Sequence, residues 1–145
     1  MLELIILTGL QGSGKTTWYR ENFAATHVHV SKDLMPNARS RETRQQQQID
    51  EALGAGRSVV VDNTNPSRES RAPLIAIGHR RGARVIAVYF EVHVPTSLMR
   101  NRAREGKARV PDIAIFRTKK QLVPPALDEG FDEVRIIPAP VTPQP

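Results

Sequence analysis

One segment near the N-terminus restricts the fold of this chain more than any other. Residues 9–16 read Gly-Leu-Gln-Gly-Ser-Gly-Lys-Thr and fit the pattern G-x-x-x-x-G-K-[ST], and a largely apolar run, 2–7, comes just before them. Glycines let the backbone curl so that successive N–H groups point inward and hold phosphate oxygens. A helix that begins within the segment adds the positive end of its dipole. The segment therefore predicts a buried strand, a phosphate-binding loop and a helix, in that order.

The residues of this loop have distinct expected roles toward a nucleoside triphosphate. Lys15 can bridge the β- and γ-phosphates of ATP, and the Thr16 hydroxyl can ligate Mg²⁺. The nucleotide-binding residues that we expect within the loop are Gly12, Ser13, Gly14, Lys15, Thr16 and Thr17. The loop does not specify the reaction, because GTPases, ATPase motors and small kinases share it. With 145 residues there is no room for the added elements of motors, and the sequence has no N-K-x-D guanine-reading motif.

Strand and helix patterns alternate along the rest of the chain. Runs rich in Val and Ile predict further strands at 28–30, 58–61, 84–90 and 134–137. Helical patterns lie between them at 14–25, 39–53, 67–80, 95–104 and 111–121. This alternation predicts an α/β fold, a three-layer P-loop NTPase sandwich with about five parallel strands, helices on both faces and a small basic lid. We expect the third strand to lie beside the first.

The last eight residues differ from the rest of the chain in composition. Residues 138–145 contain four prolines and no charge, a composition typical of polyproline-like segments. We therefore expect a kinase-sized domain over 1–137 and a Pro-rich tail over 138–145.

The positive charge is concentrated in one stretch. The chain has 21 Lys and Arg against 15 Asp and Glu, a net charge of +6. Between Arg100 and Lys120 eight basic residues face only Glu105 and Asp112, so this stretch alone carries 8 − 2 = +6. A basic patch on a neutral body favours a polyanionic partner such as nucleotide phosphates or nucleic acid. The alternative is a solvated basic surface.

Other features of composition exclude whole classes of protein. The sequence contains no cysteine, which excludes a disulfide scaffold and Cys-ligated zinc or iron–sulfur sites. It has no apolar stretch of about 18 residues, so we expect no membrane-spanning helix. The N-terminal run carries Glu3 and lacks a basic region, so we expect no signal peptide. The expected location is the cytoplasm.

Two aspartates follow strands that we expect next to the phosphate loop. Asp33 comes after the strand at 28–30 and Asp62 after the strand at 58–61, and ligands of parallel sheets bind outside the carboxyl ends of the strands. Asp33 can take the proton of an attacking hydroxyl or cap the helix that follows it. Asp62 can hold Mg²⁺ directly or through water, or serve as a capping or turn residue. Residues 63–66 predict a turn whose side chains bond backbone groups.

Two arginines mark the expected lid. Arg100 and Arg104 have the i, i+4 spacing of neighbours on one helical face, and a glycine-containing loop follows them. Paired arginines on a closing segment can neutralise charge on a transferring phosphoryl group. A solvated basic face is the alternative reading of the same residues.

From residue 5 to about residue 137 the chain resembles the kinase domain of the polynucleotide 5′-hydroxyl kinase family, a module often fused to a 3′-phosphatase. The likeness lies in GLQGSGKTTW, the stretch ending in Asp33, VVDNTNPSRESR, RNRAREGKARVPD and PALDEGF. It implies transfer of the ATP γ-phosphate to the 5′-hydroxyl end of DNA or RNA. It also implies that Asp33 is the general base, that Lys15 and Arg104 contact the donor phosphates, and that Thr16 and Asp62 hold Mg²⁺; the role of Arg100 is less defined.

One position departs from the family pattern. Some members have, three residues after the base, an arginine that grips the acceptor phosphate, whereas this chain has Pro36 there, with Arg39 and Arg41 as nearby substitutes. Two alternatives therefore stay open. One is a P-loop kinase of a small hydroxyl acceptor such as a nucleoside, a sugar or an antibiotic. The other is an ATP-gated nucleic-acid-binding module that performs no transfer. The sequence contains no D-x-D-G-T phosphatase motif and does not specify the oligomeric state.

Two histidines and two aromatic residues are expected to have structural rather than functional roles, and one further aromatic residue is expected to contact the nucleotide. His27 and His29 point to one face of a strand, where packing or strand-end contacts fit them better than a metal site. Trp18 and Tyr19 are expected in the core. Phe131, in the turn before the last strand, is expected to contact the adenine of ATP.

Overall fold

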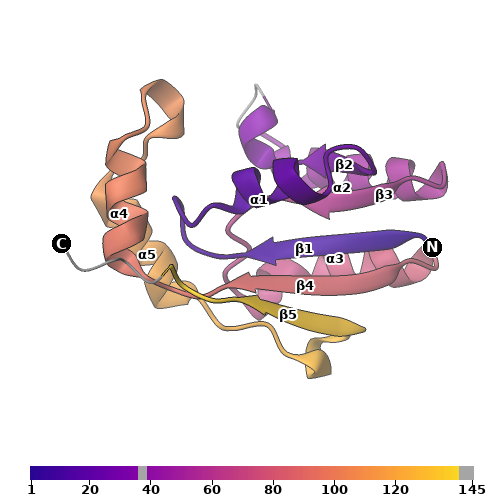
Figure 1. Ribbon diagram of the computed structural model, residues 1–145. Coiled ribbons are helices and arrows are strands. Elements are labelled where there is room, and N and C mark those ends of the chain that lie inside the picture. The colour runs from indigo at the N-terminus through magenta and orange to yellow at the C-terminus, as the bar shows by residue number, and fades with distance from the viewer. Residues whose placement is uncertain (36–38, 141–145) are drawn as a thin grey trace.

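A sheet of parallel strands crosses the domain (Figure 1). The computed structural model describes residues 1–35 and 39–140. The five strands lie in the order β2-β3-β1-β4-β5, and every neighbouring pair is parallel. The prediction of about five parallel strands, with the third beside the first, is therefore confirmed. Their bounds are β1 Glu3–Thr8, β2 His27–Val30, β3 Ser58–Val61, β4 Arg84–Phe90 and β5 Glu133–Ile137.

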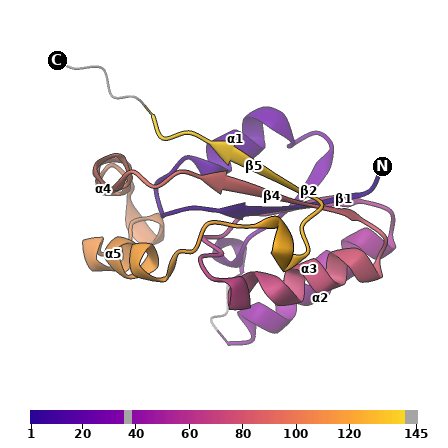
Figure 2. The ribbon, with the colours of Figure 1, turned by 90° about the horizontal axis from the view of Figure 1, so that it is seen from below.

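Helices cover both faces of the sheet. Figure 2 shows α1 on one face and α2 with α3 on the other, which gives the expected three layers. The helices are α1 Lys15–Asn22, α2 Arg41–Gly54, α3 Arg68–Arg80, α4 Val94–Arg102 and α5 Asp112–Gln121. Short 3-10 turns are η1 Lys32–Leu34, η2 Gly106–Ala108 and η3 Leu127–Glu129. In the described part of the chain, no helix is both long enough and apolar enough to cross a membrane.

The side chains of β1 explain why this strand reads as one continuous apolar run. Leu4 and Ile6 pack toward the cluster that α2 and α3 cover, whereas Ile5 and Leu7 pack into the cluster beside α1. All four are fully buried. A strand buried on both faces needs apolar residues at every position rather than at alternate ones. Burial of this central strand fixes where the loop after it begins.

The carboxyl ends of the strands all point to the same edge of the sheet, and α4 and α5 stand beyond that edge (Figure 1). The β1–α1 loop, η1 after β2 and the β3–α3 loop therefore meet there, next to the two lid helices. Helix α4 ends at Arg102, so the predicted helix extends two residues too far. Arg104 lies just past the helix rather than on its face, and its N–H donates to the carbonyl of Asn101 in a tightened last turn.

Candidate functional site

The phosphate loop is closed around the side chain of its own lysine. Lys15 Nζ donates to the carbonyl oxygens of Gly9, at 3.0 Å, and Leu10, at 2.7 Å, and to Ser13 Oγ at 3.3 Å. Gly14, the residue before α1, has a φ of 93°, in the left-handed region that favours glycine. The loop thus has the shape that the sequence predicts, with its ammonium group held at the centre.

The charge on Lys15 is sensitive to its surroundings. Burial lowers the pKa of this ammonium group to about 8; Asp62 and Asp33 act to raise the pKa, and Arg104 acts to lower it. These three side chains come from three separate segments, and all of them lie close enough to influence one ammonium group. An anion bound in the loop would favour the charged form of Lys15.

Thr16 and Asp62, which the sequence predicts to hold Mg²⁺ together, lie in contact beside the loop. The Thr16 hydroxyl donates to Asp62 Oδ2 at 2.7 Å, and His29 Nε2 lies 2.8 Å from the same oxygen. Burial by itself would raise the pKa of Asp62, but hydrogen bonds from His29 and Thr16 and the charge of Lys15 outweigh it and lower that pKa. The carboxylate is therefore held in its ionised form.

These residues fit Mg²⁺ in their chemistry. Mg²⁺ prefers oxygen ligands and takes only one or two carboxylates from the protein, with waters and substrate phosphates completing its shell. A threonine hydroxyl and a buried carboxylate beside a phosphate loop form such a set. Within the described residues there is no group of three or more His, Asp or Glu that could hold a metal by itself.

Asp33 lies on η1, at the end of β2, and is exposed. The N-terminal cap of η1 is Ser31, whose hydroxyl accepts from the Asp33 N–H at 3.2 Å, and the cap position of α2 is Ser40. The structure therefore gives Asp33 neither of the two capping positions. Asn63 holds η1 in place, because its Oδ1 accepts from the Lys32 N–H at 2.9 Å.

The loop after β3 is fixed by its asparagines. Besides binding η1, Asn63 donates through Nδ2 to Gln45 of α2. Asn65 donates through Nδ2 to the carbonyl of Leu7 at 2.7 Å, and its own carbonyl accepts from Thr8 Oγ1 at 3.0 Å. The predicted bonds from side chains of this segment to backbone groups are confirmed, although the segment is a bend with irregular backbone rather than a regular turn. The loop joins β1, η1 and α2 around the site.

A buried ion pair supports the same loop from behind. Arg71 of α3 is fully buried and makes a two-point contact with Glu129, with Nε at 2.9 Å and Nη2 at 3.0 Å from the carboxylate oxygens. Its Nη1 donates to the carbonyl of Asn65 at 2.9 Å. The charge of Arg71 is thus satisfied on every side, and Asn65 is fixed relative to α3.

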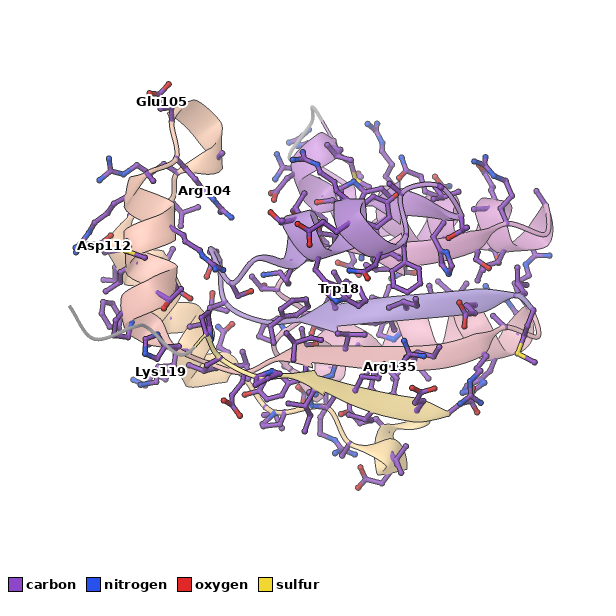
Figure 3. All side chains as sticks on the ribbon, viewed as in Figure 1. Trp18, Arg104, Glu105, Asp112, Lys119 and Arg135 are labelled. Carbon is purple, nitrogen blue, oxygen red and sulfur yellow. The ribbon has the colours of Figure 1, made fainter. Side chains whose placement is uncertain are left out.

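The lid arginines face the phosphate loop. A Cβ atom added to Gly14 would lie 2.9 Å from Arg100 Nη1, so the guanidinium of Arg100 lies directly over the loop. Figure 3 shows Arg104 on the side of the lid that faces the sheet, with Asp112 on the other side. Arg102, between the two, instead pairs with Asp112 at 2.8 Å. The basic stretch of the sequence is therefore divided between two faces of the lid.

A cavity of about 500 Å³ opens beside the loop. Its walls come from the phosphate loop and α1, from the end of β4, from the lid, and from the end of β5 with the segment that follows. The lining residues are Ser13, Gly14, Thr17, Trp18, Glu21, Phe90, Glu91, Arg100, Arg104, Ile137, Pro138, Ala139 and Pro140. Its lining combines the two lid arginines with the rings of Trp18 and Phe90. Its size and lining suit the nucleoside part of a bound nucleotide.

Two aromatic predictions have different outcomes at this cavity. Trp18 packs on Phe23 and Phe90, as expected for a core residue, and also lines the cavity. The expected adenine contact of Phe131 is wrong. Phe131 is 5% exposed and lies in the cluster under α2 and α3, because the turn before β5 directs its ring toward that face of the sheet.

Sequence reasoning missed functional neighbours that lie far apart in the chain. His29 makes the expected packing and strand-end contacts, on Tyr19 and Asp62, but the sequence did not indicate these partners. Likewise, side-chain bonds to backbone were expected for residues 63–66, but not that Asn63 binds η1 and α2. Gly12 packs against α4 rather than lining the cavity, since an added Cβ would lie 2.6 Å from the carbonyl of Ser97. Pro36, the position of the departure from the family pattern, lies outside the described residues.

Comparison with known proteins fits this geometry. The family model AAA_33, described as an AAA domain, matches residues 4–125. This chain belongs to the AAA_33 family. As an AAA_33 P-loop kinase domain it is 26% identical over 140 residues to a bifunctional polynucleotide phosphatase/kinase of Schizosaccharomyces pombe, covering 94% of this chain and 33% of that protein. A relative from Acanthamoeba polyphaga mimivirus, named for the same two activities, is 27% identical over 142 residues, with 93% and 33% covered.

Solved structures share the fold of this AAA_33 domain. A fungal RNA kinase superposes with a TM-score of 0.70 at 18% identity, over 96% of this chain and 39% of that one. A gluconokinase from Sinorhizobium meliloti superposes with a TM-score of 0.68 at 18% identity, over 99% and 84%. The chain spans about a third of the length of the curated relatives it matches. The resemblance to polynucleotide kinases is confirmed, and the domain is of the P-loop kinase type.

Proposed function

We propose that this kinase transfers the γ-phosphate of ATP to the 5′-hydroxyl end of a DNA or RNA strand. The observation that carries the proposal is the contact between Thr16 and Asp62, at 2.7 Å, beside the loop that encloses the Lys15 ammonium group. Arg104 lines the cavity next to this loop, and Asp33 lies on η1 at the same edge of the sheet. A base, a metal-holding acid and a lid arginine at one phosphate loop form the set that phosphoryl transfer needs. The relatives named polynucleotide phosphatase/kinase support this acceptor.

In the proposed reaction the 5′-hydroxyl oxygen attacks the γ-phosphorus, and the bond from that phosphorus to the β,γ-bridging oxygen breaks. The hydroxyl proton passes to the carboxylate of Asp33, and ADP leaves with the bridging oxygen. Lys15 and Arg104 neutralise the charge on the transferring group, and Arg100 holds the donor phosphates over the loop. Catalysis of this type rests on positioning and electrostatics.

Thr16 and Asp62 would hold Mg²⁺ at this site. When bound, the ion would neutralise charge on the phosphates of ATP and help to hold them against the loop. The protein contributes by keeping the carboxylate of Asp62 ionised, through the hydrogen bonds from His29 and Thr16.

Transfer of labelled phosphate tests the proposal. The protein is incubated with γ-labelled ATP, Mg²⁺ and a short 5′-hydroxyl oligonucleotide, as DNA and as RNA. We expect label at the 5′ end, and a loss of about 10²- to 10⁴-fold in rate for Asp33→Asn with the affinity for ATP kept. Full turnover by Asp33→Asn would contradict the role of the base. Absence of label on both oligonucleotides, with ATP still bound, would contradict the proposal that a 5′-hydroxyl strand end is the acceptor.

A second candidate function is phosphorylation of a small hydroxyl acceptor. The fold likeness to a gluconokinase over 99% of this chain and Pro36 in place of an acceptor-gripping arginine favour it. The two functions differ in competition. If a nucleoside or sugar is the acceptor, an excess of 5′-hydroxyl oligonucleotide should leave its phosphorylation unchanged; if a strand end is the acceptor, the oligonucleotide should suppress it.

A further inference from the structure

The loop that carries Arg104 is held at its base by one side chain. Asn101, near the end of α4, is fully buried. Its Nδ2 donates to the carbonyl of Val110 at 2.6 Å, and its Oδ1 accepts from the Val110 N–H at 2.9 Å. A primary amide is the neutral side chain that offers both a donor and an acceptor in this geometry. Asn101 thus pairs with Val110 as a strand neighbour would, and closes the loop between the lid helices.

The same residue lies where the lid touches the phosphate loop. A Cβ atom added to Gly12 would lie 3.4 Å from the backbone nitrogen of Asn101 and 2.6 Å from the carbonyl of Ser97. A second contact joins the other lid helix, because Gln11 Nε2 donates to Thr118 Oγ1 at 3.0 Å. Both lid helices therefore pack on the phosphate loop, and Asn101 connects this packed base to the loop that follows.

Arg104 depends on that connection for its position. It lies past the end of α4, and in the described residues its backbone is tied by its N–H to the carbonyl of Asn101 at 3.1 Å. An arginine side chain loses substantial rotamer entropy when it is fixed. If the loop backbone around Arg104 were also mobile, each contact of Arg104 would cost the additional entropy of ordering that backbone. A closed loop lowers that penalty before the nucleotide arrives.

We propose that Asn101 is a positioning residue that holds Arg104 over the donor phosphates. This inference rests on the proposed function only in that ATP is the donor; it does not depend on the acceptor. The exposed Arg102–Asp112 pair spans the same ends of the loop at 2.8 Å, yet both partners lie in solvent, where an ion pair contributes little. The buried amide, and not this pair, fixes the loop.

A double-mutant cycle on ATP binding tests the inference without any acceptor. The variants are Asn101→Asp, which keeps the shape but loses the donor, Asn101→Leu, which loses both groups, Arg104→Ala, and the combinations with Arg104→Ala. We expect each single change to weaken ATP binding about tenfold, and the combined variants to bind no more weakly than Arg104→Ala alone. Arg102→Ala is the matched control, and its affinity for ATP should equal that of the unchanged protein.

Amide hydrogen exchange supplies the independent readout. Residues 103–109 should exchange faster in both Asn101 variants, with the sheet and α5 unchanged, and exchange in Arg102→Ala should match the unchanged protein. Fully additive losses of ATP affinity, or normal ATP affinity in a variant with a loosened loop, would overturn the inference. A failure to phosphorylate oligonucleotides would contradict the proposed acceptor and leave these binding results intact.

Discussion

His29 and Asp62, 33 residues apart in the chain, share a hydrogen bond of 2.8 Å between Nε2 and Oδ2. The face of the His29 ring stacks on Tyr19, with ring centroids 4.3 Å apart. The Tyr19 hydroxyl in turn donates to the carbonyl of His27 at 2.6 Å. The histidine is thus held between α1 and the carboxylate. Groups that bind a metal-holding carboxylate from behind orient it and tune its affinity.

His29→Phe is therefore expected to weaken the use of Mg²⁺. Phenylalanine keeps a ring to stack on Tyr19 but cannot hydrogen-bond Asp62, so the carboxylate keeps the hydrogen bond from Thr16 and loses the one from His29. The Mg²⁺ concentration needed for half-maximal activity should rise about 10- to 100-fold, with the rate at saturating Mg²⁺ less affected. His27→Phe is the control, because His27 lies on the same strand face but pairs with Glu3. An unchanged Mg²⁺ requirement in His29→Phe would remove the role assigned to His29.

Asn63→Ala is expected to slow transfer while leaving the donor bound normally. The change removes the acceptor for the Lys32 N–H and the donor to Gln45, so η1 and Asp33 lose their fixed position. A misplaced base lowers kcat, and a displacement of about 1 Å can reduce it about 10²-fold. Steady-state kinetics separates kcat from the KM for ATP. Asn22→Ala, at an exposed asparagine of α1, should change neither quantity; a raised KM for ATP with unchanged kcat in Asn63→Ala would contradict this reading.

The sheet and the phosphate loop follow from local sequence. β1, β3 and β4 are largely apolar runs, and β1 is apolar at nearly every position because helices cover both of its faces. The loop motif carries its own backbone requirement, since the residue before α1 needs the positive φ that Gly14 adopts. Asp33 and Asp62 lie near this loop, as expected, because strands of a parallel sheet present their ends at one edge.

Contacts between distant segments could not be predicted in this way. Nothing near His29 in the sequence indicates Asp62, and nothing near Arg71 indicates Glu129, 58 residues away. The basic stretch was read as one patch, but the end of α4 at Arg102 directs Arg104 toward the site and leaves Arg102 with Asp112. A turn also does not indicate which face of a sheet its side chains join, which is why the prediction for Phe131 failed.

Glu129→Ala is expected to destabilise the fold strongly. It leaves the buried guanidinium of Arg71 without its carboxylate, and breaking a buried pair in this way costs about 3–5 kcal/mol. Urea unfolding should show this loss of unfolding free energy. Arg68→Ala breaks the neighbouring Arg68–Asp128 pair, which joins the same two elements but lies in solvent, and should leave the midpoint unchanged. Equal losses of unfolding free energy in the two variants would contradict the inference that the buried pair stabilises the fold more than the exposed pair.

Lys15→Met is expected to change how the stability of the free protein depends on pH. Burial lowers the pKa of Lys15 to about 8, from an ordinary value of 10.5. Between these values the unfolded chain binds more protons at this position than the folded chain, so the free energy of unfolding rises with pH across this window. Below about pH 8 the penalty of burying the charge is fully present. Methionine carries no charge, so the variant lacks both the penalty and this rise.

The unchanged protein should therefore gain about 2 kcal/mol of unfolding free energy relative to Lys15→Met between about pH 7 and about pH 9.5. Urea unfolding of both proteins without nucleotide, at several pH values in this range, measures the difference. Lys119→Met, at an exposed lysine of α5, should show the same pH dependence as the unchanged protein. If the curves for Lys15→Met and the unchanged protein run parallel instead, the ammonium group keeps its ordinary pKa. Burial in the loop would then carry no electrostatic penalty that a bound phosphate could relieve.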